Sequence, residues 1–250
     1  MNIKSLDLKD PRNRIVLPLD VSSIEEITQY VSLLKEYVGF FKIGFQLIHS
    51  VGGPQAIKAV KNAGGRVFYD CKLYDIPETM KKSATDISKL GVDIFNVHAS
   101  SGVKAMKWVR DVSGSSIVSA VTVLTSSSDE ECQHTYNKDV REKVTSFALD
   151  IVESGISSII CSASEAGIIK NVLGLKDQLL ITPGIRPLWA ATDDQDPDRI
   201  MTPYKAIMAG SDLLVIGRPI LNPPSTIGGP VQAAIAIAEE IRQALWDMAA

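Results

Sequence analysis

The sequence predicts an α/β fold, a single-domain (β/α)₈ barrel of the TIM type. Short apolar runs alternate with amphipathic helical segments along the chain, the pattern of βαβ units with parallel strands. Eight such units fit within 250 residues, the usual size of a closed eight-stranded barrel. An open doubly wound sheet is the structural alternative. Its Gly-rich dinucleotide fingerprint is absent after the first strand, where Pro18-Leu19-Asp20 stands, so the barrel is favoured.

The first quarter of the chain shows the repeating unit clearly. An apolar run over 15–19 predicts a strand, and Ser23 with Glu26 forms a capping box that starts a helix. The apolar positions of this helix follow the helical period: Ile24, Ile27, Val31, Leu34 and Val38. A second strand is predicted over 40–45. A helix then follows Gly52-Gly53-Pro54 and ends at Gly64-Gly65.

The same alternation continues to the end of the chain. Six further strands are predicted, over 66–70, 92–97, 117–124, 157–161, 179–182 and 213–216. Helices lie between them, for example over 140–153 and 202–209, and a last helix covers 231–248. No Pro/Ser-rich linker or low-complexity tract divides the sequence. We therefore expect one domain over 1–250, a barrel with a short N-terminal extension.

Composition and charge exclude several classes of function. The chain is 45% hydrophobic and 22% charged, with a net charge of −3, so no general affinity for nucleic acid or anionic membranes is expected. Three widely spaced cysteines, Cys71, Cys132 and Cys161, argue against a disulfide framework. The start of the chain has no apolar secretory region, and no apolar stretch reaches ~18 residues. The sequence thus predicts a cytoplasmic protein.

The segment from Asp70 to Asp75 is the most informative part of the chain. It reads Asp70-Cys71-Lys72-Leu73-Tyr74-Asp75 and directly follows an apolar run. On a strand, the side chains of Asp70 and Lys72 point to the same face. Charges at the mouth of a buried strand are costly unless they are paired, and such groups gather at functional sites. The segment predicts an enzyme; the alternative is a structural ion network across the barrel mouth.

Other charged residues fall at the same rim of the predicted barrel. Asp20 ends the first strand and Lys42 lies in the second. Because the active sites of such barrels lie at the carboxyl ends of the strands, both are candidates. Asp93 opens a strand and belongs to the opposite rim. His98 ends a strand and could face the site, although a lone His there is more often a packing residue.

A phosphate site is predicted at the ends of the last two strands. The seventh strand leads into Thr182-Pro183-Gly184-Ile185-Arg186-Pro187 and the eighth into Gly217-Arg218. Glycine lets the backbone approach an anion, and arginine binds phosphate oxygens in a bidentate manner. Barrels often bind phosphate with these two loops. The polar segment 193–199, which contains Gln195, is either a solvated loop or a flap that contacts phosphate.

Motifs for other chemistries are missing from the sequence. It contains no His-Glu-x-x-His pattern, no paired cysteines and no His/carboxylate spacing of a metal site. No Gly-x-Ser-x-Gly elbow of a serine hydrolase is present either.

Together these residues resemble the orotidine 5'-phosphate decarboxylase family. The resemblance runs from Leu17-Pro18-Leu19-Asp20 to Val215-Ile216-Gly217-Arg218-Pro219. Its centre, the stretch from Asp70 to Thr79, is similar to the family pattern Asp-x-Lys-x-x-Asp-Ile-Pro-x-Thr. Three other stretches support it, namely Asn96-Val97-His98-Ala99-Ser100, Val121-Thr122-Val123-Leu124-Thr125-Ser126 and the segment from Thr182 to Pro187.

The resemblance implies a charged tetrad of Lys42, Asp70, Lys72 and Asp75. Lys72 is expected to protonate the pyrimidine carbon as CO₂ leaves orotidine 5'-phosphate (OMP) and UMP forms. Asp70 is expected to lie against the substrate carboxylate, and Lys42 to position Asp70 and the ribose. The resemblance implies neither a metal nor a cofactor.

The resemblance also implies a homodimer and a set of substrate ligands. Asp75 is expected to reach the site from the other subunit, together with Thr79 or Ile76. Asp20 resembles a ligand of the ribose hydroxyls, and Thr125 matches the residue that holds the pyrimidine ring. The phosphate set consists of Arg186, Gln195, Gly217 and Arg218. The segment that follows Gln195 is longer than in the family pattern.

Two alternatives remain open. Magnesium-dependent sugar-phosphate enzymes, such as 3-keto-L-gulonate 6-phosphate decarboxylase and hexulose-phosphate synthase, use the same Asp-x-Lys-x-x-Asp barrel. They carry an acidic metal ligand where this chain has Lys42, and a lysine repels a divalent cation. The other alternative is a catalytically silent barrel that binds nucleotide phosphate, which would keep Arg218 but could lose the tetrad.

Overall fold

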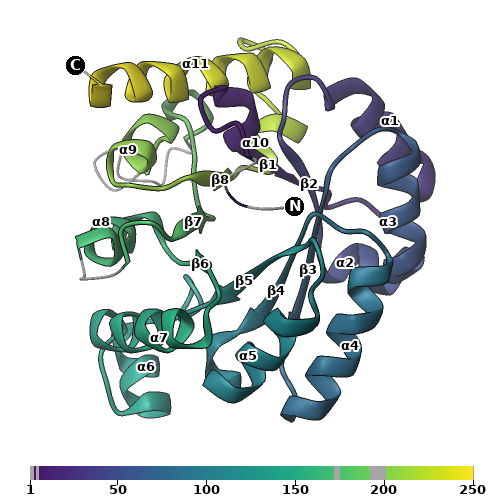
Figure 1. The fold of residues 1–250 in the computed structure, drawn as a ribbon. Coiled ribbons are helices and arrows are strands. Elements are labelled where there is room, and N and C mark those ends of the chain that lie inside the picture. Colours follow the sequence, from purple (N-terminus) through teal and green to yellow (C-terminus); the bar gives the residue numbers. More distant parts are fainter. Residues whose placement is uncertain (1–2, 4–5, 172–174, 192–200, 250) are drawn as a thin grey trace.

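The eight predicted strands form a closed parallel barrel in sequence order, as Figure 1 shows in the computed structural model. The structure describes residues 3, 6–171, 175–191 and 201–249. The strands are β1 (Ile15–Pro18), β2 (Phe40–Ile43), β3 (Val67–Leu73), β4 (Ile94–His98), β5 (Ile117–Val121), β6 (Ser158–Ile160), β7 (Leu179–Thr182) and β8 (Leu213–Val215). The first strand pairs in parallel with both β2 and β8, which closes the sheet. The predicted fold class is confirmed.

Helices surround the barrel on the outside (Figure 1). The longer ones are α1 (Ile24–Leu34), α3 (Gly53–Asn62), α4 (Pro77–Lys89), α5 (Val103–Val112), α7 (Val140–Ser154), α8 (Ala163–Asn171) and α11 (Pro230–Ala249). Shorter ones are α2 (Phe45–Leu47), α6 (Asp129–Tyr136), α9 (Pro203–Met208) and α10 (Arg218–Leu221). Single turns are η2 (Pro11–Arg14), η3 (Ile48–Gly52), η4 (Ala99–Ser101) and η5 (Leu188–Ala190). The last helix packs against α1 and η2, so the end of the chain contacts its beginning.

Helix α1 begins directly after its predicted N-cap residue, Ser23, although only one of the two hydrogen bonds of the capping box is formed. The Ser23 hydroxyl accepts a hydrogen bond from the Glu26 amide, as expected. The Glu26 carboxylate accepts from the Ser22 amide and the Ser23 hydroxyl, rather than from the Ser23 amide. The predicted apolar stripe was wrong at its ends, because Ile24 is exposed and Val38 lies beyond the helix.

The inside of the barrel is apolar at the amino ends of the strands. Inward-facing residues there form one buried cluster of Val16, Phe40, Phe68, Ile94, Ile117, Leu179, Ile181 and Leu213. Leu6 is buried against this cluster, with Ile3 and Leu8 partly buried beside it, so the N-terminal segment covers this end. Asp93 accepts a hydrogen bond from the Val67 amide at this rim, which agrees with its predicted place opposite the rim of Asp70. The charged side chains inside the barrel lie beyond this cluster, towards its carboxyl end.

No helix in the described part of the chain is long and apolar enough to span a membrane. All three cysteines are free thiols, as the absence of a disulfide framework predicts.

Candidate active site

Three charged side chains meet at the carboxyl ends of β2 and β3. The Lys42 ammonium donates to one oxygen of the Asp70 carboxylate over 2.9 Å. The Lys72 ammonium donates to the other oxygen over 2.6 Å. One carboxylate thus lies between two cations, and all three residues belong to the predicted tetrad.

The surroundings of Asp70 decide its charge. The residue is only 7% exposed, and burial alone would raise the pKa of its carboxyl group. The charges and hydrogen bonds of Lys42 and Lys72 outweigh burial and lower the pKa from 3.8 to about 2. The carboxylate is therefore ionised at neutral pH.

The backbone around Lys72 is bulged. Tyr69 pairs with Phe95 and Leu73 pairs with Val97, so three residues of β3 face the single residue Asn96 of β4. Lys72 has a φ of 45°, in the left-handed region that costs a non-glycine residue about 1–2 kcal/mol. The regular pleat therefore does not explain why Asp70 and Lys72 meet.

A cavity of about 200 Å³ opens beside these charges. Lys42, Asp70, Lys72 and Asn96 form its polar wall. The rest of the lining is mainly apolar and consists of Phe68, Val121, Val123, Leu124, Ile160, Cys161, Ile181, Pro183 and Val215, together with Thr125. Electrostatic interactions are stronger next to such apolar surface than in water, so the two ammonium groups and the Asp70 carboxylate act more strongly on a bound molecule than they would in water.

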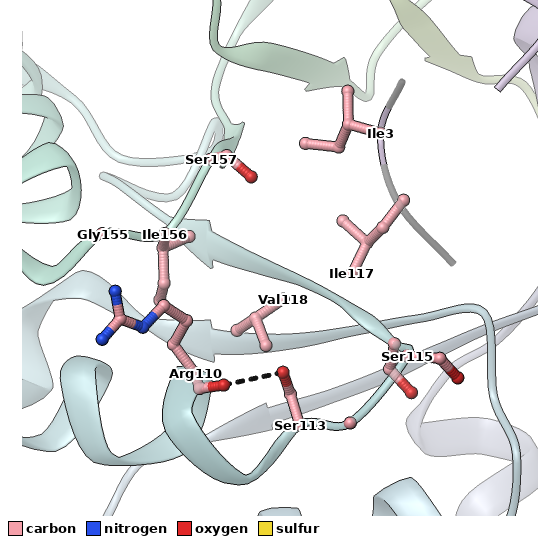
Figure 2. Close-up of a pocket in the computed structure, with 11 residues that line it drawn as sticks. Ile3, Arg110, Ser113, Ser115, Ile117, Val118, Gly155, Ile156 and Ser157 are labelled. Carbon is pink, nitrogen blue, oxygen red and sulfur yellow. Dashed lines mark hydrogen bonds between the residues drawn. The ribbon is translucent and has the colours of Figure 1, made fainter. Parts of the chain in front are cut away.

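A second hollow, of about 470 Å³, lies at the opposite end of the barrel and is shown in Figure 2. It is lined by Ile3, by the amino ends of β5 and β6 and by the turn after α5, where Ser113 donates to the Arg110 carbonyl. Among the described residues that line it, Arg110 is the one that is charged, and it already pairs with Asp111. This hollow has no acid–base pair, and the amino end of such a barrel serves stability. The smaller cavity with the charged wall is the candidate active site.

Comparison with known proteins shows the family of the chain. The model of the orotidine 5'-phosphate decarboxylase / HUMPS family matches residues 13–234. The chain belongs to this family. An orotidine 5'-phosphate decarboxylase of Geotalea uraniireducens (strain Rf4) is 38% identical over 240 residues, which cover 93% of this chain and 96% of that protein. One from Rhodopseudomonas palustris (strain BisB5) is 40% identical, with 93% and 96% covered.

A solved structure of the family has the same fold. The crystal structure of orotidine 5'-phosphate decarboxylase from Lactobacillus acidophilus superposes with a TM-score of 0.76 at 31% identity. The match covers 91% of this chain and 98% of that one. The similarity therefore includes nearly the whole barrel.

Asp75, the fourth residue of the predicted tetrad, lies apart from the other three. Its carboxylate accepts a hydrogen bond from the Ile76 amide over 2.6 Å, and the residue is exposed and does not line the cavity. Ile76 and Thr79 are exposed as well. Within one chain, the structure brings together three of the four predicted tetrad residues.

The predicted phosphate and ribose ligands follow strands at the same rim. Gly217 is the residue before α10, and Arg218 begins this helix and is exposed. Asp20 is near, because a Cβ built on Gly217 would lie 3.8 Å from its carboxylate. Arg186 follows β7, is half-buried and donates its amide to the Met201 carbonyl. Gln195 lies outside the described residues.

The remaining reactive side chains belong to the packing. His98 contacts the Tyr74 ring edge-on, and burial together with the nearby Lys72 charge lowers its pKa, so it is neutral at pH 7. Burial raises the pKa of Cys71 to about 12 and that of Cys161 as well, which leaves both as unreactive thiols. The described residues contain no group of three or more His, Cys, Asp or Glu side chains arranged to hold a metal ion.

Sequence reasoning missed the part of Asn96 in this site. In the sequence, Asn96 was noted only as the first residue of a stretch, Asn96 to Ser100, that supports the family resemblance. In the structure, its side chain lines the cavity and contacts Asp70. The signal was present, because an amide in the middle of the apolar run Ile94-Phe95-Asn96-Val97 must find hydrogen-bond partners when it is buried.

Proposed function

We propose that the protein converts OMP to UMP and CO₂ in pyrimidine biosynthesis, and that it does so without a metal or an organic cofactor. The observation that carries the proposal is the ionised Asp70 carboxylate between the Lys42 and Lys72 ammonium groups, at the wall of an otherwise apolar cavity. Membership of the family and full-length relatives that bear this name support the same reaction.

The chemistry requires a cation where negative charge develops. When the bond between the pyrimidine ring and its carboxylate breaks, CO₂ leaves and the electron pair stays on the ring carbon. A fixed ammonium stabilises this centre and then protonates it. The family pattern assigns this role to Lys72, which lines the cavity with its Nζ 2.6 Å from Asp70. Asp70 lies against the substrate carboxylate, and Lys42 holds Asp70 from the other side.

The ligands of the remaining substrate groups follow from the family pattern and their place on the rim. Asp20 binds the ribose hydroxyls, and Thr125, at the cavity, binds the pyrimidine ring. The phosphate is bound by Arg186, Gln195, Gly217 and Arg218. Binding energy from the phosphate, which takes no part in bond breaking, can organise the reacting end of the substrate.

A metal-free reaction is supported by the donors that surround Asp70. Both of its oxygens accept hydrogen bonds from ammonium groups, and Lys42 stands where the magnesium-dependent relatives carry an acid. A divalent cation at this carboxylate would have to displace two like charges. The magnesium-dependent alternative is therefore disfavoured.

We infer that the active enzyme is a homodimer in which Asp75 completes the partner's site. The carboxylate of Asp75 is flanked by exposed apolar side chains, Tyr74 at 63% and Ile76 at 66%. A second copy that covered this segment would bury both side chains and bring Asp75, with Ile76 or Thr79, to the other cavity.

We further propose that residues 1–250 act as one domain in the cytoplasm. The contacts of α11 with α1 and η2 support a single unit. Three free cysteines, two of them buried, fit a reducing compartment.

The function is tested by following the ultraviolet absorbance of OMP with enzyme treated with EDTA in metal-free buffer. We expect full turnover to UMP, unchanged when magnesium is added. Activity that returned only with magnesium would contradict the metal-free mechanism. Binding of UMP without any loss of OMP would instead indicate a silent nucleotide-binding barrel.

A further inference from the structure

We propose that Asn96 is a positioning residue of this reaction, which holds Asp70 and Lys72 in their working geometry through the β3 bulge. The inference rests on the proposed decarboxylation and concerns the chain's own device for orienting the proton donor.

Asn96 is the single residue of β4 that faces the bulge. Its side-chain Nδ2 donates to Asp70 Oδ1 over 2.7 Å, and its Oδ1 accepts from the Lys72 amide over 2.7 Å. Its backbone carbonyl accepts from the Cys71 thiol over 3.6 Å. All three residues of the bulge, Asp70, Cys71 and Lys72, are thus held by one residue of the neighbouring strand.

The amide side chain is suited to this task because it both donates and accepts. The bulge interrupts the regular pairing with β4, and Asn96 Oδ1 binds the amide of Lys72 at this interruption. The same bond stabilises the left-handed backbone of Lys72, whose φ is 45°. An aspartate would place a carboxylate against Asp70, and a leucine would satisfy neither group.

The contact with Asp70 also determines which donor binds each oxygen of that carboxylate. Asp70 Oδ1 accepts from both Lys72 Nζ and Asn96 Nδ2, while Oδ2 accepts from Lys42 Nζ. Asn96 is 1% exposed, so this arrangement is fixed by packing. Without Asn96, the carboxylate can rotate and the Lys72 ammonium moves with it.

Asn96→Ala tests the proposal, with Ser119→Ala as the matched control. Ser119 is a fully buried polar residue of the neighbouring strand β5, in register with Asn96, and it bonds Ser158 over 2.7 Å rather than Asp70 or Lys72. A misplacement of about 1 Å can cost on the order of 100-fold in rate, so kcat of Asn96→Ala should fall by about 100-fold. The phosphate-binding residues are unchanged in this variant, so KM for OMP and Kd for UMP should stay within about threefold of the wild-type values. Ser119→Ala should keep all three constants.

The outcomes separate this inference from the proposed function. If wild type does not decarboxylate OMP, the proposed function fails. If wild type is active and Asn96→Ala keeps kcat within about threefold, or loses activity through KM alone, the positioning role is overturned. Should Asn96→Ala not fold, Asn96→Asp decides by the same criteria, because it keeps the acceptor for the Lys72 amide and replaces the donor to Asp70.

Discussion

At the scale of single residues, the site depends on one buried carboxylate that two cations keep ionised. Burial of Asp70 is unfavourable by itself, and its ion pairs with Lys42 and Lys72 more than compensate. Removal of Asp70 leaves two ammonium groups without this partner, and removal of either lysine leaves Asp70 with one ion pair instead of two. A substitution of Asp70 should therefore change both the activity and the unfolding free energy, and the two effects can be measured in separate experiments.

Stability should depend on pH through Asp70. Because its folded-state pKa is about 2, below the usual 3.8, the stabilisation is complete above about pH 4 and is lost as the pH falls towards 2. Asparagine resembles the protonated carboxyl, so wild type should exceed Asp70→Asn by about 2.5 kcal/mol in unfolding free energy at pH 6. Urea unfolding from pH 6 to pH 2 should show this difference nearly disappear. Asp86→Asn, which removes an exposed partner of Lys89, should show no comparable change in unfolding free energy with pH. If the difference between wild type and Asp70→Asn stayed constant from pH 6 to pH 2, the ionised pair would be contradicted.

Lys72→Ala should abolish turnover while largely keeping the affinity for UMP. The variant lacks the proton donor, but the phosphate and ribose ligands stay in place. Turnover is measured by loss of OMP absorbance and UMP binding by calorimetry, with the exposed Lys82→Ala as the control. A rate within about tenfold of wild type would show that another group donates the proton.

The meeting of Asp70 and Lys72 could be predicted from the sequence, but its geometric cause could not. Their spacing of two predicts a shared face on a regular strand. In the structure they meet across a bulge with a left-handed Lys72, which depends on the register of β3 against β4. The role of Asn96 depends on the same register, so the local pattern indicates a hydrogen-bonded amide but does not identify its partners.

At the scale of elements, the caps and apolar runs predicted the positions of the helices and strands well. The strands near the site, however, end at other residues than predicted. The predicted strand over 117–124 ends at Val121, because Val123, Leu124 and Thr125 leave the sheet to line the cavity. Conversely, β3 extends to Leu73, three residues past its predicted end at Asp70. Where the chain builds the site, the apolar pattern does not mark the end of the strand.

The turn between β8 and α10 gives an element-scale prediction. A Cβ on Gly217 would lie 2.8 Å from the Pro18 ring, so Gly217→Ala should push the Arg218 turn away from β1. We expect KM for OMP to rise by about tenfold or more, with a smaller effect on kcat, in steady-state assays. Gly114→Ala is the control, since its φ of 60° costs backbone energy at the opposite end of the barrel. Gly114→Ala should lower the melting temperature and leave KM unchanged. If KM were also unchanged in Gly217→Ala, the turn between β8 and α10 would not position the phosphate.

At the scale of the whole molecule, the barrel separates stability from chemistry. The apolar cluster and the N-terminal segment fill the amino end, and the charged cavity opens towards the carboxyl end. The order and closure of the strands could be predicted because each βαβ unit repeats one local pattern. The position of Asp75 in a working site could not be derived from the fold of one chain, because its carboxylate lies away from the other three charges.

Subunit mixing decides whether Asp75 acts across a dimer. Asp70→Ala and Asp75→Ala should each be inactive alone. In a mixed dimer, one site lacks both carboxylates, and the other takes Asp70 from one subunit and Asp75 from its partner. Random exchange makes half of the dimers mixed, so OMP turnover should recover to about a quarter of wild type. Asp70→Ala mixed with Lys72→Ala is the matched control, since both residues serve the same subunit's site and recovery is impossible. If folded mixed dimers of the first pair stayed as inactive as this control, Asp75 would have to act within its own chain or not at all.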